Sequence, residues 1–243
     1  MKKLTFIIAI CFYHFAQSQQ FINNGLVEYE VRVDNFKSLG DDNWSQMLRD
    51  KVPHFSITWY DLTFNNNKAI YKFNRQDEKS KMPSFMSNSN EDNVWFSDYT
   101  SQTFTDQKNI FGDTYLLRDS LMSFKWKLVP NETREIAGFN CRKAQAIIFD
   151  SVYVFAFYTD EIIVPGGPMG IHGLPGMILG ITIPRMYTSW IASKVQVVGV
   201  NASAIVPPDK GKQKKASDLL ETVKKATSDW GSYAQQLIWQ LFL

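Results

Sequence analysis

The chain has 243 residues and a formal net charge of +2, from 26 Lys and Arg against 24 Asp and Glu side chains. A balance this close to neutral gives no electrostatic support for binding to nucleic acid. The length is enough for one domain with a large hydrophobic core, which is the organisation we expect.

Residues 1–18 have the features of a secretory signal peptide. Two lysines come before an apolar stretch at 4–15, and Ala16-Gln17-Ser18 is a small-x-small cleavage site in front of Gln19. The apolar stretch is shorter than the ~20 residues that a membrane span needs. We therefore expect an exported protein that begins at Gln19.

An alternative is a lipoprotein signal with Cys11 as the lipidated residue, which the bulky Ile10 before it disfavours. Without the signal, Cys141 is the only cysteine, and basic and acidic side chains number 24 each. An exported chain without an internal disulfide indicates a bacterial envelope rather than eukaryotic secretion.

The first elements of the exported chain are predicted to be strands. Residues 27–34 alternate apolar and polar side chains, which is the period of a half-buried strand. Residues 55–64 and 68–73 are rich in aromatic and β-branched side chains and flank Asn65-Asn66-Asn67. Asparagine tolerates the left-handed geometry of a tight connection, so these two stretches are predicted to form a hairpin.

More strands are predicted after the hairpin, at short intervals and with no helical period between them. They cover residues 94–99, 102–108, 114–118, 124–129, 140–149, 152–158, 177–183 and 189–198. Turns at 130–133 and 150–151 separate some of them. This pattern predicts a mainly β domain over residues 19–200, built as an antiparallel meander, a sandwich, or a partly closed sheet in the form of a half-barrel or open barrel.

Two regions are predicted to be helical. Residues 41–52 carry apolar side chains at helical spacing. After a Lys-rich linker at 201–216, Ser217 can cap a helix in the stretch 217–243. The last residues, 237–243, are very apolar, and we expect them to dock on the domain or to contact a partner.

The segment 165–176 contains five of the thirteen glycines and three of the nine prolines. Glycine permits positive φ and proline fixes φ, so this mixture specifies one rigid, irregular path. The segment closes one side of the domain or forms a binding surface. The candidate binding residues are Gly167, Pro168, His172, Gly173, Leu174, Pro175, Gly176 and Met177.

Few residues are suited to catalysis. His54 and His172 are the only histidines after the signal, which disfavours a zinc site, and no phosphate-binding loop or nucleophile elbow is present. Cys141 and His172 are the one pair that could act as nucleophile and base, although Cys141 lies in a predicted strand, where a buried structural thiol is the usual outcome. The many aromatic residues fill the core or line a cavity for an apolar ligand.

The sequence Gly173-Leu174-Pro175-Gly176-Met177-Ile178 resembles the hexapeptide that names the GLPGLI family of exported bacterial proteins. Residues 124–128, 136–144 and 157–162 also resemble that family, in its order. The resemblance implies the periplasm or cell surface of a Gram-negative bacterium rich in TonB-dependent outer-membrane transporters, and no established activity. The expected fold is similar to the half-barrel of periplasmic lipoprotein carriers.

We therefore expect a non-enzymatic envelope protein that binds an apolar or peptidic ligand, or that assists a TonB-dependent outer-membrane transporter. One alternative is a thiol-dependent hydrolase that uses Cys141 and His172. Another is an interaction scaffold that docks a partner through its apolar C-terminus. No cofactor or metal is expected.

Overall fold

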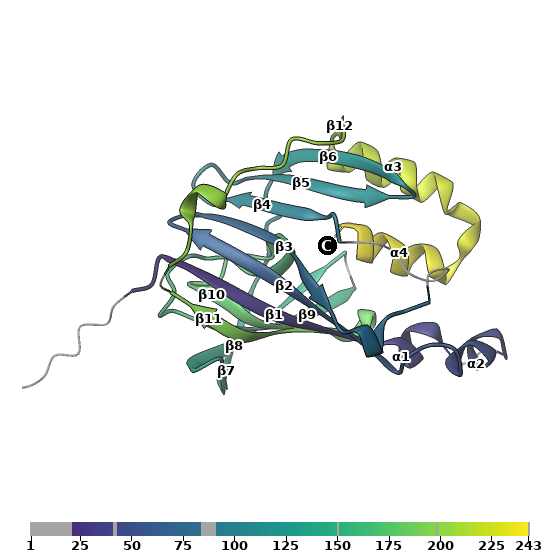
Figure 1. Ribbon diagram of the computed structural model, residues 1–243, viewed down its shortest axis with the longest axis horizontal. Helices are drawn as coiled ribbons and strands as arrows, with labels where there is room; N and C mark the ends of the chain where they lie inside the picture. Colours follow the sequence, from purple (N-terminus) through teal and green to yellow (C-terminus); the bar gives the residue numbers. More distant parts are fainter. Residues whose placement is uncertain (1–20, 41–42, 84–90, 150, 198, 243) are drawn as a thin grey trace, which may run out of the picture.

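The computed structural model describes residues 21–40, 43–83, 91–149, 151–197 and 199–242. The predicted signal peptide at 1–18 lies outside the described residues. In the described part, a single twelve-stranded sheet has the order β12-β6-β5-β4-β3-β2-β1-β11-β10-β9-β8-β7 (Figure 1). Neighbouring strands are antiparallel, except that β12 runs parallel to β6.

The strands occupy most of the predicted positions. The first half of the sheet contains β1 (Asn24–Asp34), β2 (Phe55–Asn65), β3 (Lys68–Gln76), β4 (Val94–Asp98), β5 (Thr103–Ile110) and β6 (Asp113–Ser120). The second half contains β7 (Lys127–Ile136), β8 (Phe139–Ile148), β9 (Val152–Thr159), β10 (Met177–Ile183) and β11 (Thr188–Gln196). The short β12 (Lys212–Lys214) belongs to the first half, where it lies at the edge next to β6.

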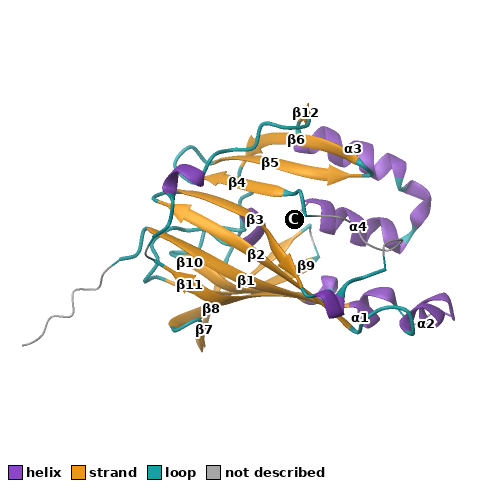
Figure 2. Ribbon diagram, viewed as in Figure 1, coloured by secondary structure: helices purple, strands orange, loops and turns teal. Residues whose placement is uncertain are grey.

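Four α-helices accompany the sheet in the described residues, namely α1 (Asn35–Leu39), α2 (Asn43–Arg49), α3 (Ala216–Ala226) and α4 (Ser232–Phe242). Single 3-10 turns include η2 (Pro168–Gly170), η3 (Pro184–Met186) and η5 (Ser228–Trp230). The strands curve around a common interior, and the helices gather at one end of the molecule (Figure 2). None of the described helices is long and apolar enough to cross a bilayer.

The sheet is open, because β7 and β12 form its two ends and do not pair with each other. The alternation predicted for residues 27–34 is confirmed: Val27, Tyr29 and Val31 are buried, whereas the glutamates between them face outward. β1 joins the two halves, since it pairs with β2 on one side and β11 on the other. The prediction of a mainly β half-barrel with a C-terminal helix is confirmed.

The predicted turn at 130–133 is wrong. These residues belong to β7, and the ladder with β8 is irregular between Leu128 and Thr133, which pair with Ala144 and Arg142. Five steps along β7 therefore match two steps along β8, and the extra residues bulge out of the strand. Asn131 has φ of 60°, which provides the local left-handed turn inside the bulge.

The C-terminal region differs from its prediction in two details. Part of the expected linker adds a strand to the sheet, because Lys212 pairs with Tyr115 in β6. The predicted cap at Ser217 is wrong, since the helix begins at Ala216 and the residue before it, Lys215, provides no side-chain cap. That helix packs on β5 and β6 through a second apolar cluster, formed by Ile110, Leu117, Leu219, Val223 and Ile238.

The glycine- and proline-rich segment 165–176 covers one side of the main core. Ile171 and Leu174 are buried within it, and its backbone is tied to the sheet by a hydrogen bond of 2.8 Å from the Ile178 N–H to the Gly166 carbonyl. Gly176 has φ of +137°, and a Cβ atom there would lie 2.0 Å from the Thr159 carbonyl oxygen. Only glycine fits at this position.

Candidate ligand-binding site

A cavity of about 790 Å³ lies between the concave face of the sheet and α4. Alternate residues of β1, β2, β3, β4 and β11 form its floor, and the side chains of α1 and α4 close it from the other side. The strands present these residues because successive side chains of a strand point to opposite faces. Val31 lies opposite Trp190, and Val33 lies opposite Thr188, so both pairs line the cavity from adjacent strands.

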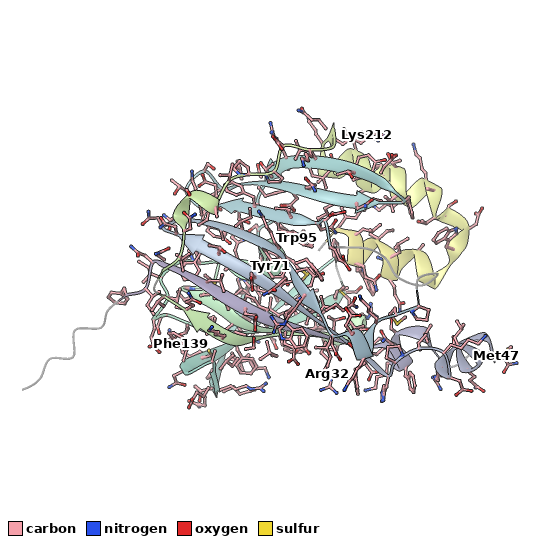
Figure 3. The ribbon with its side chains drawn as sticks, viewed as in Figure 1. Arg32, Met47, Tyr71, Trp95, Phe139 and Lys212 are labelled. Atoms are coloured by element: carbon pink, nitrogen blue, oxygen red, sulfur yellow. The ribbon has the colours of Figure 1, made fainter. Side chains whose placement is uncertain are left out.

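Aromatic rings form the apolar part of the floor. Tyr60 and Tyr71 stack with ring centroids 5.0 Å apart, and Trp95 meets Tyr71 edge to face at 5.4 Å. Tyr71 and Trp95 lie on the inner side of the curved sheet, whereas Arg32 lies on its outer side (Figure 3). These rings provide a large, rigid apolar surface.

Three methionines complete the apolar lining. Met82, Met169 and Met186 come from three separate loops and turns around the cavity. Met169 belongs to the 165–176 segment and has φ of 56°, a left-handed conformation that is uncommon outside glycine. Methionine side chains are flexible and polarisable, so they adapt to ligands of different shape.

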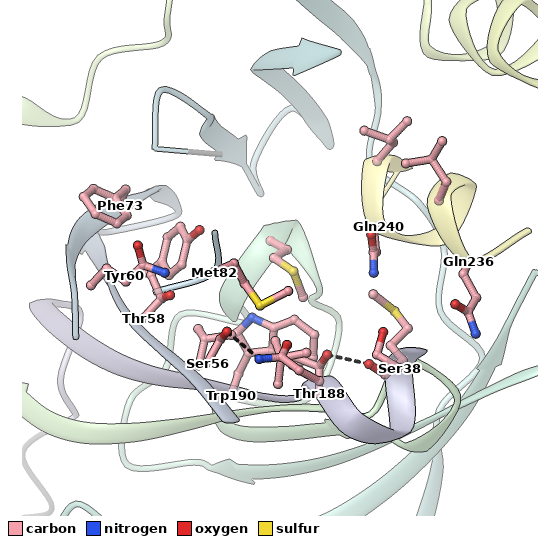
Figure 4. A pocket seen from close by; sticks show the side chains of 18 of the residues that line it. Ser38, Ser56, Thr58, Tyr60, Phe73, Met82, Thr188, Trp190, Gln236 and Gln240 are labelled. Carbon is pink, nitrogen blue, oxygen red and sulfur yellow. Dashed lines mark hydrogen bonds between the residues drawn. The ribbon is translucent and has the colours of Figure 1, made fainter. Parts of the chain in front are cut away.

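Uncharged polar side chains line the other part of the cavity, where α1 and α4 face each other, together with Leu39, Leu237 and Leu241. Gln236 and Gln240 extend from α4 toward the side on which Ser38 and Thr188 lie (Figure 4). The amide of Asn35 donates to Ser56 Oγ at 2.8 Å and to the Pro53 carbonyl at 2.9 Å. These hydrogen bonds attach the start of α1 to β2 and so fix this side of the cavity.

The hydroxyl group of Tyr71 has no hydrogen-bond partner among the described residues. The residue is 2% exposed, and burial raises the pKa of its hydroxyl well above the ordinary value, so it is a neutral donor. The N–H of Trp190 approaches this hydroxyl, but the geometry is not that of a hydrogen bond. Because an indole N–H only donates, the Tyr71 hydroxyl proton has no acceptor among the described residues.

A buried pair of opposite charges lies beside the cavity without lining it. Desolvation raises the pKa of Asp106 to about 7 and lowers the pKa of Lys108 to about 8, while each charge favours the other. Lys108 Nζ donates to the Leu241 carbonyl oxygen at 3.0 Å and lies 5.3 Å from the ring centroid of Trp95. The pair therefore connects β5 to the last turn of α4, which covers the cavity.

The residues predicted to bind a ligand lie elsewhere, and none of them lines the cavity. Gly167, Pro168, His172, Leu174, Gly176 and Met177 are buried, whereas Gly173 and Pro175 are exposed. Burial lowers the pKa of His172, whose Nδ1 lies 3.0 Å from the Gly170 carbonyl oxygen. From the segment 165–176, Met169 is the residue that reaches the cavity.

Cys141 and His172 are engaged with separate backbone groups. Cys141 is fully buried, and its Sγ donates a weak hydrogen bond to the Phe139 carbonyl oxygen at 3.5 Å. Burial raises the pKa of this thiol to about 12, which opposes formation of a thiolate near neutral pH. Within the described chain, no cluster of three or more His, Cys, Asp or Glu side chains could hold a metal ion.

Comparison with models of known protein families finds no match to this chain. Comparison with curated proteins finds no match either. The resemblance to the GLPGLI family therefore stays a prediction.

The chain resembles solved structures at the level of the fold. Two crystal forms of PNGF-II, in space groups C2 and P21, have TM-scores of 0.50 and 0.49 and identities of 15% and 14%. Each match covers 84% of this chain, which spans about a third of PNGF-II. An uncharacterized conserved protein from Thermus thermophilus matches with a TM-score of 0.41 and 3% identity, over 81% of this chain and 93% of its own.

Proposed function

We propose that the protein is a non-enzymatic binding protein of the bacterial envelope, and that it holds an apolar ligand between the concave face of the sheet and α4. The observation that carries this proposal is the cavity of about 790 Å³ with its aromatic and methionine lining. Ligand sites typically have volumes of roughly 300–1,000 Å³ and are mostly apolar with a few polar groups. The cavity meets both criteria.

The ligand position proposed here differs from the one expected from the sequence. The segment 165–176 serves mainly as a cover of the core, since Ile171 and Leu174 are buried under it. One residue of the segment, Met169, lines the cavity next to the aromatic floor. The rigid path of this segment therefore supports binding indirectly, by holding one wall in place.

Binding can be tested by titration of the delipidated chain, beginning at Gln19, with the apolar dye Nile red. Trp95 and Trp190 line the cavity and report occupancy through their fluorescence. We expect saturable binding that the substitution Thr58→Trp reduces at least about tenfold, because a large ring then fills the cavity. Absence of saturable binding to the original chain would contradict the proposal.

The matched control is Thr182→Trp, which makes the same substitution at an exposed position of β10. We expect this variant to bind the dye like the original chain. If both variants lose binding equally, the loss reflects a general effect of the added ring and the cavity is not the site. Circular dichroism of both variants checks that the sheet is retained.

The envelope location and a transporter partner are supported by the signal-like residues 1–18 and by the family resemblance. Expression with a C-terminal tag, followed by fractionation and in-cell crosslinking, tests both. We expect the mature chain in the periplasmic or surface fraction and a crosslinked outer-membrane transporter. Retention of the uncleaved chain in the cytoplasm would contradict the location.

A further inference from the structure

We infer that the cavity selects a neutral lipid that contains an ester carbonyl, of the acylglycerol type, over ligands that carry a charge. This inference rests on the proposed function and adds the chemical class of the ligand. Its basis is the near absence of charge in the lining and the uncharged hydrogen-bonding side chains that α1 and α4 present to the cavity.

The lining contains almost no charge. Among the described residues, Glu91 is the one lining side chain with a formal charge, and it is exposed to solvent. A carboxylate or phosphate placed in the cavity would therefore meet no cation and would lose its hydration without compensation.

The charges nearest the cavity do not change this conclusion. Lys108 directs its ammonium to the Leu241 carbonyl and is electrostatically paired with Asp106, so its positive charge is already balanced. Arg185 lies over the ring of Trp239, with its Cζ 5.7 Å from the ring centroid, and does not line the cavity. Neither cation is positioned as the counter-ion of an anionic ligand.

The polar groups that do line the cavity are suited to an uncharged ligand with an acceptor. The side-chain amide of Gln240, which lines the cavity, can donate a hydrogen bond to an ester carbonyl. Ser38, Gln236 and Gln240 stand on the side of α1 and α4 and can both donate to and accept from the hydroxyl groups of glycerol. The acyl chain then lies on the aromatic floor.

A peptide fits these features less well. Each peptide unit brings a backbone donor and acceptor, and buried backbone groups need partners. The floor around Tyr60, Trp95 and Trp190 is aromatic and offers few acceptors for backbone N–H groups. A ligand with one long apolar chain and a single polar end needs fewer hydrogen-bond partners from this lining than a peptide does.

Displacement of Nile red by four compounds with the same acyl length tests the inference. The compounds are monopalmitoyl glycerol, methyl palmitate, palmitate and hexadecylamine, and the titrations are made at a pH where the last two are charged. We expect the two neutral esters to bind at least about tenfold more tightly than either charged compound, because methyl palmitate and palmitate differ essentially in charge. Equal or tighter binding of palmitate would overturn the inference.

The outcomes separate this inference from the proposed function. If Nile red binds but no ester displaces it, or if a capped apolar peptide displaces it better than the esters, the ligand class is wrong and the binding function stands. If Nile red itself does not bind, both proposals fail. Copurification of an acylglycerol, detected by native mass spectrometry, would support the inference directly.

The substitution Gln240→Leu tests the hydrogen bond to the ester. We expect about fivefold weaker binding of methyl palmitate, the effect of one neutral hydrogen bond, and unchanged binding of pyrene, which has no acceptor. Gln235→Leu is the control, because Gln235 is exposed on α4 and does not line the cavity. A Gln240→Leu variant that binds both compounds like the original chain would contradict the role of this amide.

Discussion

The hydroxyl of Tyr29 donates a hydrogen bond of 2.6 Å to the carbonyl oxygen of Ile178, 149 residues later in the chain. Both residues are completely buried. The ladder between β10 and β9 is irregular between Ile178 and Gly180. The Tyr29 side chain thus ties β1 to the start of β10, directly after the Gly-Leu-Pro-Gly segment.

Substitution Tyr29→Phe is expected to lower the free energy of unfolding by about 1–3 kcal/mol, because it removes a buried hydrogen bond to the Ile178 carbonyl. Urea unfolding measures this loss. The control is Tyr71→Phe, which removes a hydroxyl that has no acceptor in the described residues and should change stability little. Similar losses in both variants would show that the Ile178 contact is not the cause.

Substitution Gly176→Ala is expected to prevent stable folding or to cost several kcal/mol, because the new Cβ would overlap the Thr159 carbonyl. The matched control is Gly112→Ala in the β5–β6 hairpin, where φ is +85° and nothing lies within 4 Å. That variant has no steric overlap and loses only the cost of placing a residue other than glycine at positive φ, roughly 1–2 kcal/mol. Thermal unfolding of the two variants compares these costs, and equal melting temperatures would contradict the close approach at Gly176.

Substitution Lys108→Met is expected to cost about 3–5 kcal/mol, because it leaves Asp106 buried without its positive partner and removes the bond to Leu241. The double variant Asp106→Asn with Lys108→Met removes both charges and should recover most of this loss. Its asparagine can still accept from the Phe96 N–H, as Asp106 does at 3.2 Å. A double variant less stable than Lys108→Met would contradict this account.

The buried pair of Asp106 and Lys108 also predicts how the stability of the protein depends on pH. The folded pKa of Asp106 is raised, so its contribution is fully present at acid pH and is lost as the pH rises from about 4 to about 7. The folded pKa of Lys108 is lowered, so its penalty is relieved only above about pH 8. The stability of the double variant relative to the original chain should therefore be most favourable between pH 7 and 8 and less favourable on both sides, as measured by urea unfolding of both chains across this range.

Cys141 is expected to be unreactive in the native protein, because it is buried and its thiol pKa is about 12. Ellman's reagent should react with it only in concentrated guanidinium chloride. The control is Ile147→Cys in a Cys141→Ala background, since Ile147 is 50% exposed on the same strand. Rapid labelling of Cys141 in the folded chain would reopen the thiol-dependent alternative.

The sequence predicts the strands well because their periodicity is local. The alternation over residues 27–34 and the asparagines between β2 and β3 are visible without any tertiary information. The predicted turn at 130–133 fails because proline and asparagine indicate a chain reversal, whereas a bulge accommodates the same residues inside β7. The parallel pairing of β12 depends on contacts with β6, far away in the chain.

The cavity is harder to predict, since its walls come from β1 through to α4 and are assembled only by the fold. One local signal does exist in β2, where the inward positions change from Ser56 and Thr58 to Tyr60, Leu62 and Phe64. That change from polar to apolar marks the part of the concave face that the core does not fill. The apolar residues 237–243 indicate that the end of the chain docks on the domain or on a partner, but they do not indicate that α4 covers this face and turns it into a cavity.

The bulge in β7 also affects how the molecule meets its neighbours in solution. β7 is the last strand of the sheet, so the outer side of its backbone has no partner strand in the described structure. Pro130 lacks an N–H, and the irregular stretch up to Thr133 interrupts the regular spacing of donors and acceptors. The exposed margin of the sheet is thereby a poor template for edge-to-edge aggregation.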